Sequence, residues 1–182
     1  MQNLILIKPD MEYADEIWDY RRETLESGGR AHGGSSLARF ANAADWIDYC
    51  RRAEREETLP DSRLATADQF MLVDADARRV LGLINFRHYL KGDLVEYGGH
   101  IGYGVRPSQR RKGYAKRMLR MCLDYAGERG LDKALVTCLT DNEASRRTIL
   151  SCGGVFERTS TRGDETFERY WITIDPRAKP RG

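Results

Sequence analysis

The spacing of hydrophobic residues in the first part of the chain predicts a strand followed by two helices. Residues 4–7 are consecutively apolar, which is typical of a short buried strand. Apolar residues then recur with helical spacing over residues 11–26 and again over residues 43–53. The intervening residues 27–36 contain four glycines together with Arg30 and His32. They are predicted to form a loop that either holds a substrate or only connects the two helices.

The middle of the chain changes to short apolar runs separated by polar breaks, a pattern that indicates neighbouring strands. Residues 69–74 and 80–89 are such runs on either side of a polar turn, which predicts a hairpin. Residues 94–105 follow a second polar break and end in apolar residues that alternate with small ones, so we predict a third strand there. Pro107 ends this strand, because proline has no N–H to donate to a sheet.

The last part of the chain predicts alternating helices and strands. Helical periodicity is strong over residues 114–129, and Gly130 follows where a left-handed cap is expected. A strand, a short helix and two more strands are expected at residues 134–139, 142–151, 155–159 and 167–174. The fold class predicted is α/β (α+β), with residues 1–174 as one domain and residues 175–182 as a polar tail. Its single central mixed sheet would have about seven strands, flanked by about four helices.

Composition excludes several classes of protein. The 182 residues include 41% apolar ones, enough for one domain with a buried core and too many for a disordered chain. Lys and Arg number 30 against 28 Asp and Glu, so the formal net charge is only +2. These totals do not indicate nucleic acid or an anionic membrane as a partner, and any basic site must be local.

The cysteines and the first residues suggest a cytoplasmic protein without a metal site. Cys50, Cys122, Cys138 and Cys152 form no CxxC pair and have no histidine at a ligand spacing. Cys122 and Cys138 lie in apolar stretches, where a free thiol packs as a small hydrophobic side chain. The start of the chain has neither the basic leader of a signal peptide nor the length of a membrane span, so no membrane partner is expected.

The clearest chemical signal joins the third strand to the long helix. Basic residues surround Gly113 in this stretch, namely Arg110, Arg111, Lys112 and Lys116. The first N–H groups of a helix have no partner within it, and the helix dipole is positive there, so they can hold a phosphate or pyrophosphate. The same residues are also consistent with a solvated basic turn that caps an ordinary helix. Neither GxxxxGK[ST] nor a GxGxxG directly before a helix is present.

Two motifs resemble those of the GNAT superfamily of acyl-CoA-dependent N-acyltransferases. The segment Arg110-Arg111-Lys112-Gly113-Tyr114-Ala115 is similar to the family's Q/R-x-x-G-x-G/A signature and lies between a strand and an amphipathic helix. The segment Asp141-Asn142-Glu143-Ala144-Ser145, followed by Gly153-Gly154-Val155-Phe156, is similar to the second motif, N-x-x-A/S. The predicted order of elements also matches, so the resemblance covers nearly the whole chain and implies a GNAT-like fold.

The resemblance implies acetyl-CoA as cosubstrate and no metal. The N–H groups of residues 111–116 would bind the pyrophosphate. Val105 would bond the pantetheine arm and help to polarise the thioester carbonyl, and Asn142 and Ser145 would contact the far side of the arm. The implied cofactor-binding residues are Val105, Arg110, Arg111, Lys112, Gly113, Tyr114, Ala115, Lys116, Asn142 and Ser145.

The residues that move protons are less clearly marked. Many family members place a tyrosine seven residues after the asparagine of the second motif, where it protonates the departing thiolate, and Ile149 occupies that position here. Tyr170, Tyr103, Cys152 and solvent are the alternatives. The candidates for the base that deprotonates the amine are Glu96, His100 and Tyr103, with Glu96 slightly preferred for its charge. Each of the three is also consistent with a purely structural or solvated role. Arg30 and His32 would lie on the acceptor side.

The function implied by the resemblance is that of an N-acetyltransferase. It would transfer an acetyl group from acetyl-CoA to a primary amine of a small molecule, a peptide or a protein, by direct attack in a ternary complex. A non-catalytic acyl-CoA-binding regulatory module is an alternative, because Ile149 replaces the usual acid. An RNA-binding domain that uses the basic segment of residues 106–120, which begins at Arg106, is a second one, and the low net charge and the lone aromatic Tyr114 in that segment argue against it. The sequence leaves open the acceptor, the acyl-chain preference and the oligomeric state. A homodimer through the last strands is common in proteins that resemble this one.

Overall fold

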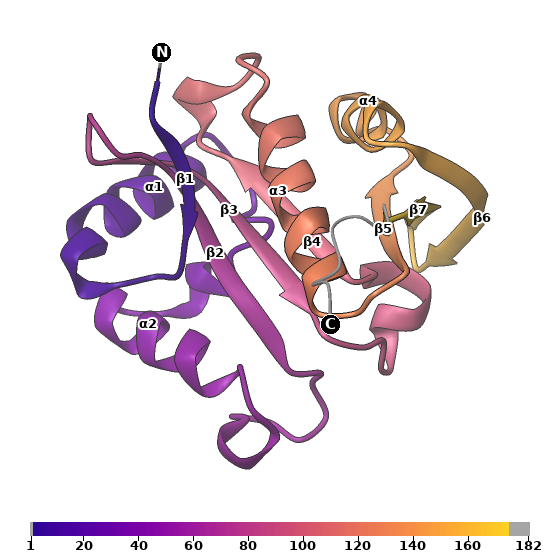
Figure 1. The fold of residues 1–182 in the computed structure, drawn as a ribbon, viewed down its shortest axis with the longest axis horizontal. Helices are drawn as coiled ribbons and strands as arrows, with labels where there is room; N and C mark the ends of the chain where they lie inside the picture. The colour runs from indigo at the N-terminus through magenta and orange to yellow at the C-terminus, as the bar shows by residue number, and fades with distance from the viewer. Residues whose placement is uncertain (1, 175–182) are drawn as a thin grey trace.

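A computed structural model describes residues 2–174 and contains a seven-stranded mixed sheet in the order β1-β2-β3-β4-β5-β7-β6 (Figure 1). Neighbouring strands are antiparallel except for β4 and β5, which are parallel. The strands are β1 (Leu4–Ile7), β2 (Ala67–Asp74), β3 (Arg79–Arg87), β4 (Ile101–Val105), β5 (Lys133–Leu139), β6 (Gly154–Arg162) and β7 (Glu165–Thr173). The helices are α1 (Ala14–Glu26), α2 (Ala43–Arg52), α3 (Tyr114–Glu128) and α4 (Glu143–Ser151). The predicted mixed sheet with its flanking helices is confirmed, and the predicted tail lies outside the described residues.

Helices cover both faces of the sheet, and a separate apolar core lies under each layer. The core under α1 and α2 contains Ile17, Tyr20 and Trp46, packed on side chains such as Leu83 of β3. The core under α3 and α4 contains Met118, Cys122 and Ile149, packed on the opposite face of the same strands. Successive side chains of a strand point to opposite faces, so one sheet can support both layers. We refer below to the α1/α2 face and the α3/α4 face.

The prediction for residues 94–105 is wrong in its first half. Leu94–Gly98 form a π-helical turn, and β4 begins only at Ile101. Gly99 has a φ of +65° and turns the chain into the strand, with its backbone against the carbonyl oxygen of Leu135. Carbonyl groups of the turn are satisfied from distant strands, because Arg169 of β7 donates to the oxygens of Val95 and Glu96. An apolar run cannot reveal such partners, since they come from elsewhere in the sequence.

Other predicted boundaries need only small changes. A short 3-10 turn, Met11–Tyr13, precedes α1, and Gly130 after α3 has the expected left-handed conformation, with a φ of +88°. The last two strands are longer than their apolar runs, because they form a hairpin with a polar tip, whose register shifts between Phe156 and Arg158. None of the helices within residues 2–174 has the length and apolar character required to cross a membrane.

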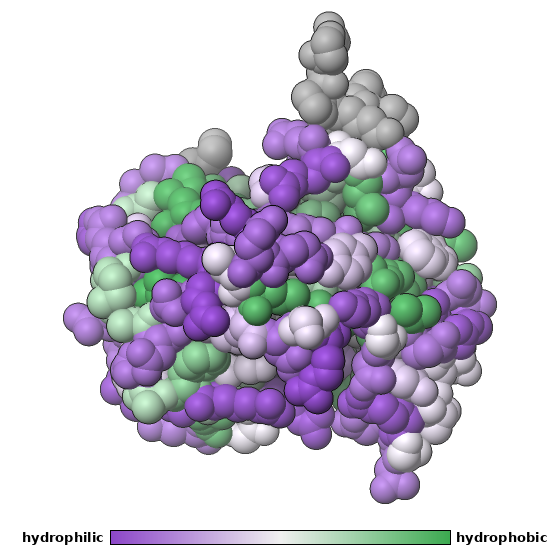
Figure 2. Space-filling view, turned by 90° about the horizontal axis from the view of Figure 1, so that it is seen from below, coloured by the Kyte–Doolittle hydropathy of each residue, from purple (hydrophilic) through white to green (hydrophobic). Residues whose placement is uncertain are grey.

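The surface seen in Figure 2 is mainly hydrophilic, with apolar residues in small separate patches. Val155 and Phe156, which are 67% and 53% exposed, lie on β6 at the edge of the sheet. Scattered exposed apolar side chains are normal for a soluble surface and do not identify a partner. The homodimer through the last strands therefore stays a prediction.

Candidate active site

The sheet splits between its two parallel strands. β4 and β5 pair at a single position, Ile101 with Val136. Beyond this pair, β4 continues beside β3 as far as Val105, and β5 continues beside β7 as far as Leu139. The two strands therefore diverge, and the backbone of residues 102–105 is left without β5 as a partner. We call this divergence the split.

The turn that follows β4 presents free N–H groups at the start of α3. Arg111 and Gly113 have φ values of +63° and +81°, and a Cβ on Gly113 would meet nothing within 4 Å. Gly113 is therefore required by its backbone conformation and not by lack of space. Within residues 2–174, the N–H groups of residues 111–116 have no acceptor, and the first bond of the helix runs from Arg117 N–H to the Gly113 oxygen. With the exposed cations Arg110, Arg111 and Lys112 beside them, these N–H groups can hold an anion.

Arg106 anchors this turn to α1. Its guanidinium is 3% exposed, and its Nη2 lies 3.3 Å from Oε2 of Glu16. Glu23 accepts a hydrogen bond from the N–H of Ser108 at 2.6 Å and lies 3.8 Å from Nε of Arg106. Sequence reasoning included Arg106 in a basic surface segment. The structure instead shows that the side chain points inward and fixes the turn between β4 and α3.

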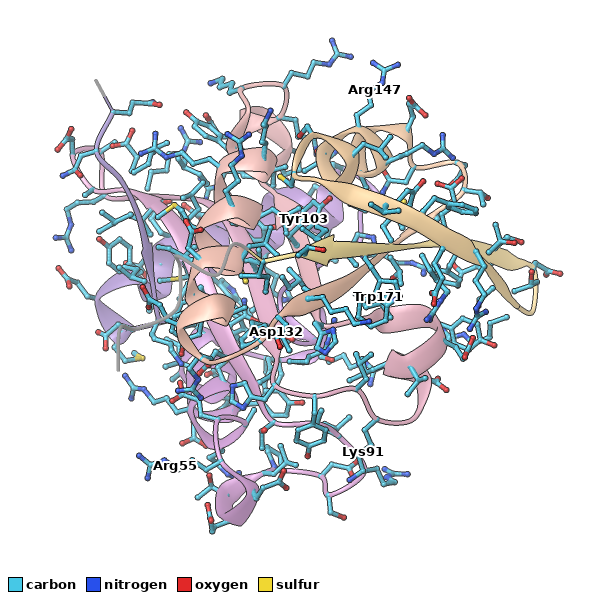
Figure 3. All side chains as sticks on the ribbon, turned by 45° about the vertical axis from the view of Figure 1, so that its right-hand side comes forward. Arg55, Lys91, Tyr103, Asp132, Arg147 and Trp171 are labelled. Carbon is cyan, nitrogen blue, oxygen red and sulfur yellow. The ribbon has the colours of Figure 1, made fainter. Side chains whose placement is uncertain are left out.

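Tyr103 connects β4 with α4 across the split. Its side chain points to the α3/α4 face (Figure 3). Its hydroxyl lies 2.9 Å from Oγ of Ser145. Asn142 caps α4, since its Oδ1 accepts the N–H of Ser145 at 3.1 Å. Burial raises the pKa of Tyr103, so the phenol stays protonated at neutral pH. Tyr103, Asn142 and Ser145 thus meet at the split, whereas Ile149 is fully buried under α4, against Gly154.

Glu96 and His100 lie outside this meeting point and are both engaged. Glu96 belongs to the π-helical turn and accepts hydrogen bonds from Arg158 at 2.7 Å and from Ser160 at 3.0 Å. These bonds lower the pKa of Glu96. His100 accepts the N–H of Leu135 at Nδ1, at 2.9 Å, so the proton of the neutral ring must be on Nε2. Burial lowers the pKa of His100 to about 4. The acceptor nitrogen of His100 is therefore occupied, and the ion pair with Arg158 makes the carboxylate of Glu96 a weaker base.

The glycine-rich loop covers the split on the α1/α2 face. A Cβ on Gly33 would lie 2.5 Å from the Cα of Tyr103, and one on Gly104 would lie 2.5 Å from the backbone oxygen of His32. Arg30 reaches across to β7, where its Nη1 lies 3.1 Å from Oε1 of Glu165. No hydrogen bond to the imidazole of His32 is found in the described part of the chain. Its pKa is lowered by burial and by the neighbouring Arg30.

The remaining candidates for a proton donor are less suitably placed. The hydroxyl of Tyr170 donates to Oε2 of Glu168 at 2.7 Å, and burial raises its pKa to about 12. Sγ of Cys152 lies 3.8 Å from the backbone oxygen of Lys116, near the start of α3. No group of His, Cys, Asp and Glu side chains within residues 2–174 is arranged to hold a metal ion.

Two residues beside the split were missed by the sequence reasoning. Arg87 ends β3 with its guanidinium near Gly102, and Tyr20 of α1 has its hydroxyl near Gly104. The only signal for Arg87 is its position two residues after Asn85, at the end of an apolar strand. Alternation in a strand places both side chains on one face, and Asn85 bonds Ser35 of the glycine-rich loop. Tyr20 gives no signal, because an aromatic residue in an amphipathic helix is ordinary core.

Comparisons with known proteins agree with this geometry. A profile of the acetyltransferase (GNAT) domain matches residues 5–155. The fold is similar to that of a ribosomal-protein-S5-alanine acetyltransferase from Vibrio fischeri, with a TM-score of 0.72, 15% identity and coverage of 96% of this chain and 95% of that chain. It is similar to a microcin C7 self-immunity acetyltransferase in complex with acetyl-CoA and AMP, with a TM-score of 0.67, 17% identity and coverage of 94% and 92%. It is also similar to a spermidine N-acetyltransferase from Vibrio cholerae in complex with CoA and spermine, with a TM-score of 0.65, 13% identity and coverage of 94% and 95%. No curated protein matches the sequence.

A split mixed sheet beside a basic helix N-terminus, matched by this profile, defines an acyl-CoA-dependent N-acyltransferase. The chain belongs to the acetyltransferase (GNAT) domain family, whose profile covers most of its length. The resemblance drawn from the two sequence motifs is therefore confirmed.

Proposed function

We propose that the protein transfers an acetyl group from acetyl-CoA to a primary amine of a small molecule, a peptide or a protein. The observation that carries this proposal is the split between β4 and β5, which opens directly beside the free N–H groups of residues 111–116. The similar structures support the same reaction, because one is named for a ribosomal-protein alanine and one for spermidine, while the microcin C7 self-immunity acetyltransferase contains acetyl-CoA and the spermidine N-acetyltransferase contains CoA. Their different acceptors show that the fold alone does not select the amine.

Our proposal for the cosubstrate assigns its two ends to the two halves of the site. The pyrophosphate binds the N–H groups of residues 111–116, with Arg110, Arg111, Lys112 and Lys116 as counter-charges and Gly113, Tyr114 and Ala115 as backbone donors. The pantetheine arm lies in the split beside Val105, with Asn142 and Ser145 on its far side. Asn142 already uses its Oδ1 to cap α4, so its contact would come from the amide nitrogen.

In the proposed reaction the amine attacks the thioester carbonyl directly. The new N–C bond forms, the C–S bond breaks, the ammonium group loses a proton and the departing thiolate gains one. Beyond Ile101, the backbone N–H groups of β4 that face away from β3 have no partner on β5 and can stabilise the oxyanion. Tyr103 is our candidate for the acid, since its protonated hydroxyl lies in the split. His32 is our candidate for the base, acting directly or through water, in place of the engaged Glu96 and His100.

Nothing in the fold or the comparisons supports a non-catalytic module or an RNA-binding domain. The basic segment also offers RNA a smaller surface than its sequence suggests, because Arg106 is buried against Glu16 and Glu23. The cytoplasmic location stays a prediction, consistent with four free cysteines.

A comparison of two glycine variants tests the cosubstrate site. Gly113 and Gly130 lie at opposite ends of α3, both have positive φ, and both have open space around the Cβ position. Replacement of either by Asp therefore strains the backbone similarly, but only Gly113→Asp places a negative charge at the proposed pyrophosphate site. We expect CoA and acetyl-CoA to raise the melting temperature of the wild type and of Gly130→Asp, and not that of Gly113→Asp. Absence of stabilisation in the wild type at saturating CoA would refute the proposal.

A second measurement tests turnover. Thiol release from acetyl-CoA is followed in the presence of a panel of primary amines that includes amino acids, polyamines and peptides with free N-termini. At least one amine should accelerate thiol release, and mass spectrometry should find one acetyl group on that amine. A stable acetyl-enzyme formed during turnover would contradict direct attack.

A further inference from the structure

Arg87 borders the split on the face that α3 and α4 leave free. It is the last residue of β3, and a Cβ on Gly102 would lie 3.3 Å from its Nη2 and 3.4 Å from its Nη1. Gly102 directly follows Ile101, the last residue of β4 that pairs with β5. Successive residues of a strand point to opposite faces, and Tyr103 points to the α3/α4 face. The side-chain position of Gly102 therefore faces the α1/α2 face. The guanidinium therefore lies where the strands begin to diverge.

This guanidinium has no carboxylate partner among residues 2–174. Its Nη1 donates to the backbone oxygens of Gly98 and Gly99, each at 3.2 Å. Burial lowers the pKa of Arg87 to about 10, with no compensating carboxylate nearby. Other arginines around the same face are ion-paired, in the pairs Arg30–Glu165, Arg158–Glu96, Arg162–Asp93 and Arg169–Glu157.

The unused donors of Arg87 form a fork. A guanidinium has five N–H donors, and Nη1 supplies the two that reach Gly98 and Gly99. Within residues 2–174, Nε and Nη2 of Arg87 remain without a partner. Both are accessible to solvent, because the only fully buried side-chain nitrogen or oxygen without a partner in this part of the chain is Nε of Arg106. The Nε and Nη2 edge matches the two oxygens of a carboxylate or phosphate. A largely buried cation without such a partner is costly, and an anionic ligand would remove that cost.

We propose that the acceptor amine carries a carboxylate or phosphate group, which binds Nε and Nη2 of Arg87 while the amine faces the thioester. This inference rests on the proposed acetyl transfer and deepens it. With α3, α4 and the cosubstrate on one side of the split, the acceptor approaches from the α1/α2 face, where Arg87 lies. Gly102 contributes by having no side chain, which keeps the space beside the guanidinium free. Arg87 is a specificity-determining residue in this scheme.

Matched amines test the proposal by turnover. The probes are β-alanine with its amide 3-aminopropanamide, and ethanolamine phosphate with ethanolamine. In each pair only one member, called the anionic member here, carries a negatively charged group, and the two pairs distinguish a carboxylate from a phosphate. The wild type should favour the anionic member of at least one pair at least tenfold in kcat/KM, mainly through KM. Arg87→Gln should abolish that preference, by lowering kcat/KM for the anionic members far more than for their partners, and Arg87→Lys should restore it in part. Arg162→Gln removes an ion-paired arginine of the same face, and it should leave the preference for the anionic member unchanged.

Binding to the CoA-saturated protein gives the same comparison without turnover. Calorimetric titration with the N-acetyl products of the four probes should show tighter binding of an anionic product, and Arg87→Gln should remove the difference. Equal binding of both members of each pair, or no binding of any product, would overturn the proposal. An equal loss for anionic and neutral members in Arg87→Gln would also overturn it, and would assign Arg87 to holding the turn Leu94–Gly98. Failure of the proposed acetyl transfer is recognised separately, because no amine of the panel would then accelerate thiol release from acetyl-CoA in the wild type.

Discussion

The hydroxyl of Tyr103 lies 2.9 Å from Oγ of Ser145, and this contact joins β4 to the first turn of α4 across the split. Tyr103 thereby places a protonated phenol on the side of the split where the resemblance expects a proton donor. The usual position for that donor is Ile149, which is fully buried. A donor on the strand can therefore replace one on the helix, provided that it reaches the same space.

Replacement of Tyr103 by Phe should lower kcat without weakening the binding of CoA. The phenol would no longer protonate the departing thiolate, and general acid catalysis is typically worth about 100-fold or more. Thiol-release kinetics and thermal shift with CoA measure the two effects separately. Ser145→Ala is the matched control, because it removes the partner of the hydroxyl and leaves the phenol in place. A wild-type kcat in Tyr103→Phe would exclude Tyr103 as the acid.

The elements that sequence periodicity predicted well are those whose signal is local. Helix α3 and β5 need only their own apolar spacing and caps, and both motifs lie at the starts of helices. The turn Leu94–Gly98 was missed because its carbonyl groups are satisfied by Arg87 and Arg169, which lie on other strands. The same reason applies to the site. Backbone donors around Gly113 could be predicted from the chain, whereas the engagement of His100 with Leu135 depends on how two strands meet.

Replacement of Gly33 by Ala should impair acceptor use more than it impairs stability. The new Cβ would lie 2.5 Å from the Cα of Tyr103, so the glycine-rich loop would have to move away from β4. Gly28→Ala is a close control, since Gly28 has nearly the same φ, +71° against +70°, and nothing within 4 Å of its Cβ position. We expect a raised KM for the amine in Gly33→Ala alone, with CoA stabilisation unchanged in both variants. Equal kinetics of the two variants would show that the loop only connects α1 and α2.

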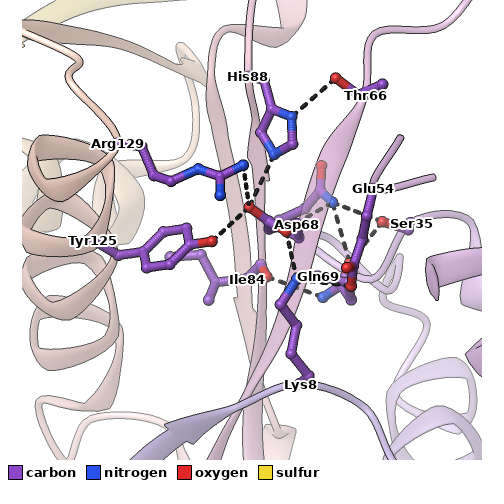
Figure 4. A network of polar contacts seen from close by, with 11 residues as sticks. Lys8, Ser35, Glu54, Thr66, Asp68, Gln69, Ile84, His88, Tyr125 and Arg129 are labelled. Atoms are coloured by element: carbon purple, nitrogen blue, oxygen red, sulfur yellow. Dashed lines mark hydrogen bonds and ion pairs between the residues drawn. The ribbon is translucent and has the colours of Figure 1, made fainter. Parts of the chain in front are cut away.

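Asp68 should make the largest single carboxylate contribution to stability. Its side chain is 4% exposed and contacts His88 at 2.9 Å, Tyr125 at 2.8 Å and Lys8 (Figure 4). Burial alone would raise the pKa of Asp68, but the bonds from His88 and Lys8 outweigh it and lower the pKa. Asp68→Asn leaves a buried cluster without its negative charge. We expect this to lower the free energy of unfolding by about 3 kcal/mol or more. Thermal unfolding should show a clear loss, whereas Asp61→Asn, at an exposed ion pair with Arg63, should be nearly neutral.

The same carboxylate should control stability at low pH. Because the folded pKa of Asp68 lies below the ordinary value of 3.8, its stabilisation is present above that pH and is lost as the pH falls through the folded value. The melting temperature of the wild type should therefore drop below about pH 4, and that of Asp68→Asn should depend less on pH in this range. An equal fall in melting temperature with decreasing pH in the two proteins would show that other carboxylates dominate acid unfolding.

The pH dependence of kcat/KM should identify His32 as the base. Its pKa is lowered below the ordinary value of 6.5 by burial first and by Arg30 second, so the imidazole is neutral and able to accept a proton at pH 7. The wild-type rate should fall as the pH drops through this lowered pKa, because protonated His32 cannot act as a base. His32→Gln should lose that acid limb together with roughly 100-fold in rate at pH 7. Arg30→Gln should keep the limb but move it to higher pH, since removal of a nearby cation raises the pKa of a histidine and leaves the attraction of Glu165 unopposed. A limb that is unchanged in both variants would exclude His32 as the base, and a limb that disappears in His32→Gln but does not move in Arg30→Gln would show that Arg30 does not lower the pKa of His32.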